Sequence, residues 1–363
     1  MQPINFTNMT ECKKCLFTDD VVKIHPDGEC EYCKLHEKQT LEADPKKWDV
    51  LLKKIQKKGK QYDCLIGISG GEDSSVLLYS AVKVWKLKPL VIHFNNRTNR
   101  PVANNNIKVL VDHLNVNFIE YYLDKSEYDA LTDSLLKAGV PDADIGNDVC
   151  MAKLMVKTAL DYNIKYILNG HSFREEGSSP KAWSVIDYTY LNSVYKKFNG
   201  KDLVNYPLLT VWDQIYSAAR GIVKVSPFHY HHHNRSEIIR EMKKIGWQDY
   251  GGKHNENIYT AFIGNYVLPR KFGIDKRVTY LSAQIREGKT TKTSAKIILQ
   301  RPSDFNIDDL GFRRDWLLHL VNSSPIGNRS EYKMTNFKRL KPLFWVLAKL
   351  GVVPISMYNK YCK

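Results

Sequence analysis

An apolar strand that runs directly into a glycine-rich turn and then a helix is the feature that most limits how this chain can fold. "YDCLIGIS" (62–69) is followed by "GGEDSS" (70–75), and helical spacing begins at once. Apolar strands and helical patterns then alternate: strands at 89–96, 116–123 and 164–170, helices at 102–115 and 147–163. This alternation predicts an α/β fold with a doubly wound parallel sheet that helices cover on both faces.

The 363 residues allow more than one domain. We expect a zinc-binding module at 1–42, a nucleotide-binding α/β domain at 43–225 and a mostly helical region at 226–363. The first residues lack the apolar core of a signal peptide, and lysines and prolines interrupt the apolar stretch 340–358. We therefore expect a cytoplasmic protein without a membrane span. The helix at 147–163 should bury its apolar face, made of Val149, Ala152, Leu154, Val156, Ala159 and Leu160.

Four of the seven cysteines form two C-x2-C pairs, "CKKC" and "CEYC". Each pair places two thiolates on one side of a tight turn, and two pairs complete a tetrahedral sulfur site that suits Zn²⁺. Because protein atoms fill all four positions, the zinc should be structural. Disulfides or free thiols are the alternative, which the expected compartment disfavours. The predicted ligands are Cys12, Cys15, Cys30 and Cys33.

Polar segments follow three of the predicted strands: "SGGEDSS", "HFNNRTN" and "NGHSFREEG". In parallel sheets, ligands bind at the carboxyl ends of the strands, so these segments should line one crevice. Gly70 and Gly71 allow a sharp turn whose amides, with the helix start, can hold an anion. The turn lacks the G-K-[ST] ending of a Walker A loop and the G-x-G-x-x-G of dinucleotide-binding folds.

The motif S-G-G-x-D-S-S after a first strand resembles the PP-loop of ATP pyrophosphatases. This family includes synthetases of GMP, NAD, asparagine and argininosuccinate, and several tRNA-modifying enzymes. The resemblance implies that ATP binds here and is cleaved to AMP and pyrophosphate. "GHSFREE" resembles the second element of the family, which implies catalytic roles for His171 and Glu175 beside Asp73 and Ser74, with Glu176 a weaker match. The implied ATP-binding residues are Ser69, Gly70, Gly71, Asp73, Ser74, Ser75, His93, Asn95 and Gly170.

The acidic residues of the turn can be explained by a metal ion. ATP binds together with Mg²⁺, and this ion prefers oxygen ligands such as carboxylates. We expect Asp73 to hold the magnesium ion or its water shell. The same carboxylate is also placed to cap the helix. Glu72 is expected to face solvent.

Over residues 10–300 the motifs and their order resemble those of the N-acetyl sugar amidotransferases. The shared elements are the double knuckle, "HFNNRTNRPVANNNI", "GHSFREEG", "WQDYGGKHNE" and "LPRKFGIDKR…YLSAQIREG". The resemblance implies adenylation of an N-acetyl carbonyl and replacement of AMP by ammonia, giving an acetamidino group. This chemistry serves surface glycans such as lipopolysaccharide O-antigen. The resemblance also implies separate glutaminase and cyclase-like subunits that supply ammonia.

Two other functions remain open. A net charge of +15 also suits a PP-loop enzyme that thiolates or amidates a tRNA base. Thiolation usually needs a reactive cysteine, and only Cys64, within a strand, and Cys150, on a helix, remain in the nucleotide domain. A zinc-bearing scaffold without activity is the third hypothesis.

Basic residues gather after residue 250 and suit an anionic or nucleotide-linked sugar, although a solvated basic face is the alternative. "HYHHHN" brings together His229 and His231–His233, which we interpret as a polar loop before a helix rather than a second metal site. The amphipathic patterns "RRDWLLHLV" and "LFWVLAKLG" predict helices that bind a partner or pack over the nucleotide domain. The predicted substrate-binding residues are Lys253, His254, Arg270, Lys271, Lys276 and Arg277.

Overall fold

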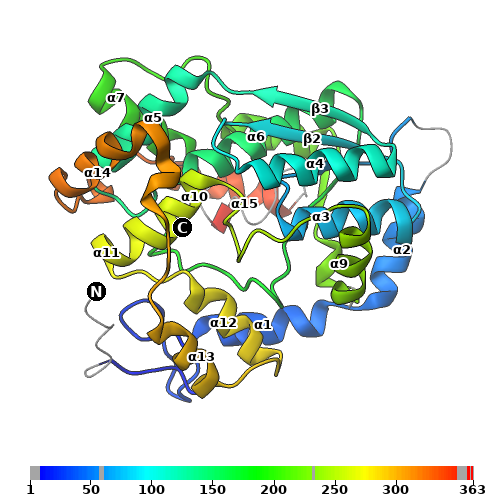
Figure 1. Ribbon diagram of the computed structural model, residues 1–363, viewed down its shortest axis with the longest axis horizontal. Coiled ribbons are helices and arrows are strands. Elements are labelled where there is room, and N and C mark those ends of the chain that lie inside the picture. Colours follow the sequence, from blue (N-terminus) through cyan, green and yellow to red (C-terminus); the bar gives the residue numbers. More distant parts are fainter. Residues whose placement is uncertain (1–8, 57–60, 231–233, 350–357, 360, 363) are drawn as a thin grey trace.

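A five-stranded sheet forms the centre of the molecule, with every strand pair parallel and the order β3-β2-β1-β4-β5. The computed structural model describes residues 9–56, 61–230, 234–349, 358–359 and 361–362 (Figure 1). The strand order reverses between β1 and β4, so the loops after these two strands flank the position where such folds bind ligands. The strands are β1 (Cys64–Gly67), β2 (Pro89–Asn95), β3 (Asn117–Tyr122), β4 (Tyr166–Leu168) and β5 (Val223–Val225).

Alternate residues of the central strands enter two separate hydrophobic cores. Leu65 of β1 packs in a core with helices α5, α6 and α7. Its neighbour Ile66 packs in the other, with helices α2, α3, α4 and α9. This confirms the predicted doubly wound α/β architecture. The bounds are α2 (Pro45–Ile55), α3 (Glu72–Tyr79), α4 (Pro101–Leu114), α5 (Lys125–Lys137), α6 (Ile145–Asp161), α7 (Tyr188–Asn199) and α9 (Arg235–Lys244).

The outer parts of the sheet differ from the expected pattern. β3 is an edge strand whose side chains are exposed or half-buried, rather than covered on both faces. The short strand β5 was not predicted, because it offers only three residues, two of them exposed. On α6, Val149, Leu154, Val156 and Ala159 are buried as predicted, whereas Ala152 and Leu160 are half-buried.

The N-terminal cysteine segment and helix α1 (Glu31–Glu42) lie beside α12 (Arg277–Arg286) and α13 (Lys292–Gln300), below the sheet in Figure 1. Of the late helices, α14 (Arg314–Ser323) lies against α5, where the Trp316 indole donates to Asp133 at 2.7 Å. Phe344 of α15 (Lys341–Lys349) is buried with Val211 of α8 (Val211–Ala219). Both contacts agree with the expected packing over the nucleotide domain.

The remaining helical segments connect these parts. Among the described residues, no helix has both the length and the apolar character needed to cross a membrane. His231–His233 lie outside the described residues, and His229 ends a short 3-10 turn. The segments are α10 (Ile258–Phe262), α11 (Leu268–Phe272), π turns at Ser80–Val84 and Ile263–Val267, and 3-10 turns at Pro227–His229, Ile307–Arg313, Arg329–Glu331 and Lys338–Leu340.

Candidate functional site

The turn after β1 is shaped by two glycines that no larger residue could replace without movement. Gly70 has φ +78°, and a Cβ there would lie 2.2 Å from the carbonyl oxygen of Ala103. A Cβ on Gly71 would lie 2.6 Å from the Glu256 carboxylate. The hydroxyls of Ser69 and Ser74 are 3.2 Å apart. The serine-lined turn therefore meets α3 at its N-terminus, where amide groups favour anions.

For two residues of this turn, Ser75 and Asp73, the structure differs from what the sequence predicts. Ser75 is fully buried, and its hydroxyl accepts from the Trp247 indole at 3.1 Å, so its role here is packing. Gly71 is the N-cap of α3 and Asp73 lies within the first turn, so the prediction that Asp73 caps the helix is wrong. The Asp73 side chain instead points to cations.

Arg235, the first residue of α9, binds three carboxylates, two from the first turn of α3 and one from the loop after β4. Its Nε donates to Glu72 at 2.5 Å and its Nη1 donates to Glu175 at 2.7 Å, while Nη2 bonds Asp73. The sequence suggested that Glu72 faces solvent. In the structure its carboxylate is instead bound by Arg235. The single guanidinium ties the turn after β1 to the loop after β4, and the sequence pattern gave no sign of it.

Asp73 is also 3.6 Å from the Nζ of Lys253. Burial opposes ionisation of Asp73, but the charges of Lys253 and Arg235 outweigh it and lower the pKa of the carboxyl. Asp73 is thus held as a carboxylate. Mg²⁺ is commonly bound by one or two carboxylates together with substrate phosphates, and Asp73 fits such a role.

The loop after β4 (169–177) brings the second predicted motif to the same place. Gly170 lies so close to the turn that a Cβ would be 2.8 Å from the Asp73 carbonyl oxygen. His171 Nδ1 lies 2.9 Å from Glu176. Burial disfavours the imidazolium, but the hydrogen bond and the charge of Glu176 raise the pKa of His171. Asp73, Ser74, His171 and Glu175 are therefore brought together, as predicted.

A segment between α9 and α10 lies over the turn and was only partly anticipated. The Tyr250 hydroxyl accepts the amide of Glu72 at 2.6 Å, and Ser69 donates to Glu256 Oε1 at 3.3 Å. Lys253 Nζ and Glu256 Oε2 are buried without a hydrogen-bond partner. Buried polar atoms without a hydrogen bond need an explanation, and a charged ligand bound beside the turn would supply partners to both.

The end of β2 contributes mainly to the frame of the site. His93 is buried, with Nδ1 2.8 Å from the Ile68 carbonyl oxygen and Nε2 3.1 Å from the Asn99 amide. Burial lowers the pKa of His93, so the ring is neutral. Asn95 donates to Glu120 at 2.7 Å. Both side chains have protein partners, which favours supporting roles over direct contact with a nucleotide.

The predicted basic cluster divides into two groups. Lys253, His254 and Lys276 act electrostatically on three acidic groups, namely Asp73, Asp144 and Asp148. Lys271 instead donates to the carbonyls of Val321 and Ser324, at the end of α14. Arg277 binds Asp275 and the last carbonyls of α13, and Arg270 stacks on Tyr266 at 3.9 Å. The last three side chains therefore serve the helical frame, a role that sequence spacing cannot distinguish from ligand binding.

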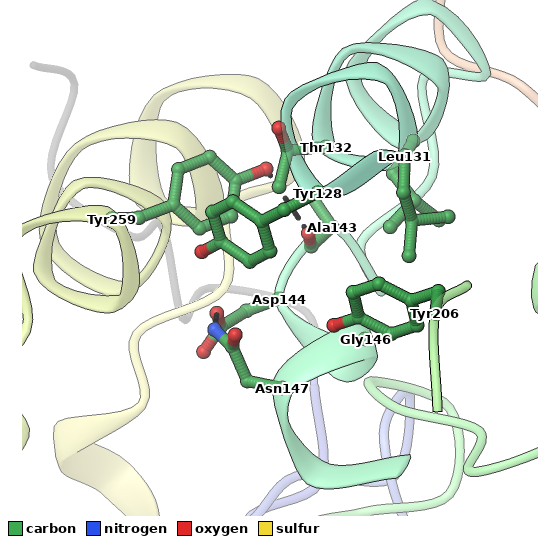
Figure 2. Close-up of a pocket in the computed structure, with 10 residues that line it drawn as sticks. Tyr128, Leu131, Thr132, Ala143, Asp144, Gly146, Asn147, Tyr206 and Tyr259 are labelled. Carbon is green, nitrogen blue, oxygen red and sulfur yellow. Dashed lines mark hydrogen bonds between the residues drawn. The ribbon is translucent and has the colours of Figure 1, made fainter. Parts of the chain in front are cut away.

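A tyrosine-lined gap lies beside the N-terminus of α6 (Figure 2). Figure 2 shows Tyr128, Tyr206 and Tyr259 around it, with Asp144 and Asn147 below. The gap holds about 160 Å³ of unfilled space but is too narrow for a water molecule, and the buried Tyr206 hydroxyl has no partner. Burial raises the pKa of Asp144 to about 6. This gap is a feature of side-chain packing rather than a substrate pocket.

The four predicted cysteines form the one group of metal-ligating atoms of its kind within the described residues. All four sulfurs lie within 4.8 Å of one another, with Cys12–Cys33 at 3.7 Å and Cys15–Cys30 at 3.6 Å. Tetrahedral Zn–S bonds of about 2.3 Å require sulfur separations of about 3.8 Å. The residues thus fit one tetrahedral ion. The sulfurs of a [4Fe–4S] cluster bind separate irons and would lie further apart.

Residues 256–340 match a family model described as "LPS biosynthesis protein WbpG-like, C-terminal domain". This match confirms the expected relationship to polysaccharide-synthesis proteins over that segment. The segment begins at Glu256, the residue that touches Ser69 and Gly71 of the turn. No curated protein sequence matches the chain.

Several solved structures are similar to the chain at low sequence identity. A U34-tRNA thiolase from Methanococcus maripaludis with its [4Fe-4S] cluster is 11% identical, covers 89% of this chain and 99% of its own, and has a TM-score of 0.35. An NMN synthetase from Francisella tularensis is 14% identical over 55% and 93% of the two chains, with a TM-score of 0.28. An NH3-dependent NAD synthetase from Campylobacter jejuni is 12% identical over 59% and 95%, with a TM-score of 0.29. The fold class stated above follows from the sheet order itself.

Proposed function

We propose that the chain is an ATP-dependent amidotransferase that converts the N-acetyl group of a sugar into an acetamidino group during surface-polysaccharide synthesis. The observation that carries the proposal is a juxtaposition. The first residue of the segment matched by a lipopolysaccharide-biosynthesis model lies on the serine-glycine turn of an α/β nucleotide fold. The contact between the serine-glycine turn and a segment related to sugar-pathway proteins supports the proposal.

The reaction divides into two balanced steps. The amide oxygen of the N-acetyl group attacks the α-phosphorus of ATP, forming an O–P bond and releasing pyrophosphate. Ammonia then adds to the activated carbon, the C–O bond breaks, AMP leaves, and a proton is released as the amidine forms. Adenylation is needed because an amide oxygen is a poor leaving group, whereas AMP is a good one.

The side chains of the crevice have distinct roles in this scheme. The α3 amides and the hydroxyls of Ser69 and Ser74 would hold the pyrophosphate oxygens, and Lys253 would neutralise part of their charge. A bound Mg²⁺ would supply charge neutralisation on the phosphates, and Asp73 would hold it. His171, whose pKa Glu176 raises, would carry a proton at its ring and donate a hydrogen bond.

Ammonia is expected from a separate subunit. Cys64 and Cys150 are both fully buried, and burial raises the pKa of each thiol, that of Cys150 to about 12. A buried thiol of raised pKa is a poor nucleophile, which argues against both a glutaminase activity of these residues and sulfur transfer to tRNA.

The test is incubation of the purified chain with ATP, Mg²⁺, ammonium and a panel of N-acetyl sugar nucleotides. The expected result is release of AMP and pyrophosphate together with a sugar lighter by the difference between an oxygen atom and an NH group. If only tRNA stimulates pyrophosphate release, the chain is a tRNA-modifying enzyme and the proposal fails. If no acceptor does so, the scaffold hypothesis gains support.

A further inference from the structure

Two consecutive residues at the end of α12 join the cysteine module to the crevice. Arg286 donates from Nε to Cys33 at 3.3 Å and from Nη2 to Cys15 at 3.4 Å. Glu287, the next residue, contacts both α1 and the loop after β4. One of its oxygens lies 2.8 Å from His36 Nε2 on α1, and both oxygens accept from Arg174 Nη1, at 2.9 and 3.2 Å.

This contact is buried, unlike most ion pairs of the molecule. The side chains of His36, Glu287 and Arg174 are 9%, 11% and 13% exposed. The Phe173 ring lies between them, with its centroid 5.1 Å from that of His36 and 4.9 Å from the Arg174 guanidinium. In such surroundings, removal of one partner leaves the other charge unpaired, which is far more costly than at the surface.

Arg174 belongs to the loop after β4, and three other residues of this loop, His171, Glu175 and Glu176, belong to the candidate site. Glu175 accepts from Arg235, which also binds Asp73, and His171 pairs with Glu176. The chain of contacts therefore runs from the cysteine sulfurs through α12 to the loop, and from the loop to the carboxylate expected to hold Mg²⁺. Loop 169–177 contains no helix or strand of its own, so these side-chain contacts help to fix its position, together with those of Lys289 with Glu175 and of the Asn169 amide with Val225.

We infer that Glu287 is a positioning residue, through which the metal module sets the place of His171 and Glu175 relative to the Ser-Gly-Gly turn. The module thus acts on the reaction without touching substrate. The inference depends on the proposed function only in treating loop 169–177 as catalytic. Its structural part, that Glu287 orders the loop, stands on the contacts alone.

The experiment compares the metal-loaded full chain with Glu287→Gln and Lys292→Met. Lys292 donates to the Cys12 carbonyl at 2.7 Å, so it also docks the module, but it makes no contact with loop 169–177. Hydrogen exchange is measured on loop 169–177, with the amides of β1 and β2 as an internal check of folding. Metal content and ATP-dependent pyrophosphate release are measured in parallel.

Glu287→Gln should keep its metal and normal exchange in β1, while exchange in loop 169–177 rises several-fold. Misplacement of groups in a site by about 1 Å can cost a hundredfold in rate, so kcat should fall about tenfold to a hundredfold. Lys292→Met should leave both quantities close to those of the parent. Arg174→Met should reproduce the effect, and the double variant should add little to either single one.

Equal loop exchange and equal turnover in Glu287→Gln and Lys292→Met would overturn the inference, because Glu287 would then only dock the module. Loss of metal from Glu287→Gln would also overturn it, since the carboxylate would then serve the metal site. Hydrogen exchange requires no substrate, so the two proposals can fail separately. If the parent chain releases no pyrophosphate but loop 169–177 exchanges faster in Glu287→Gln, the positioning role is supported and the proposed function is refuted.

Discussion

In the cysteine module, every ligand atom comes from the stretch between Cys12 and Cys33, and all four side chains are buried. In the crevice, the charged atoms come from the turn 69–75, the loop 169–177, Arg235 and the segment 248–257. The module forms a closed set of ligands, whereas the crevice keeps buried polar atoms of Lys253 and Glu256 unsatisfied. From this difference we propose that the local site serves stability and the assembled site serves binding, and four variants test this division.

The largest effect is expected from Cys30→Ser, because a tetrahedral ion loses one of its four ligands. Structural zinc contributes on the order of 10 kcal/mol to the folding of small modules. We expect loss of the metal and of hydrogen-exchange protection over residues 9–42, measured by metal analysis and mass spectrometry. Cys64→Ser is the control, since Cys64 is equally buried but lies outside the cluster. Full metal occupancy in Cys30→Ser would contradict the assignment.

Asp73→Asn should slow the chemistry strongly and leave the module intact. Removal of one preorganised charged or polar group from a reacting phosphate commonly costs about 10²–10³ in rate. We expect a loss of that size in ATP-dependent pyrophosphate release, with unchanged metal content. Glu241→Gln, which removes a carboxylate on the surface of α9, serves as the comparison. Parent-like release in the Asp73 variant would show that the turn is not the nucleotide site.

Gly70→Ala should destabilise the turn through two separate terms. The φ of +78° costs a side chain about 1–3 kcal/mol, and the new Cβ would also meet the Ala103 carbonyl oxygen at 2.2 Å. Gly200→Ala isolates the first term, because Gly200 has φ +70° and nothing within 4 Å of the added carbon. Urea unfolding should therefore show a greater loss for Gly70→Ala. Equal losses would mean that the turn and α4 separate without cost.

The smallest effect is a pH dependence of stability. Because the folded pKa of His171 is raised, its pair with Glu176 stabilises the fold below the unfolded pKa, about 6.5, and this contribution is lost as pH rises through the folded pKa. The loss of stability in His171→Gln should therefore be larger at pH 6 than at pH 8.5, by unfolding measurements. Burial lowers the pKa of His229 to about 4, so that neighbour stays neutral throughout. A pH-independent deficit would show that the pair does not titrate in this range.

Sequence reasoning recovered the elements that depend on near neighbours in the chain. The cysteine spacing, the serine-glycine turn and the alternating strands each have a local pattern, and the structure agrees with all three. The sequence did not predict a role for Arg235, because it is the first residue of an ordinary helix. Only tertiary packing brings it to Glu72, Asp73 and Glu175. For the same reason, spacing could not tell Lys253, beside Asp73, from Lys271, at the end of α14.

The start of the matched segment at Glu256 has a practical consequence for building hybrid proteins. The Glu256 carbonyl accepts the Arg100 amide at 2.8 Å, and the Ile258 amide donates to Thr98 at 2.7 Å, so main-chain bonds tie this border to the loop after β2. A chimaera joined at Glu256 would separate Lys253 from Glu256, and the segment that lies on the turn after β1 would then come from two parents. A junction before Gln248 would transfer residues 248–257 as one unit, so that Tyr250, Lys253 and Glu256 would come from the same parent.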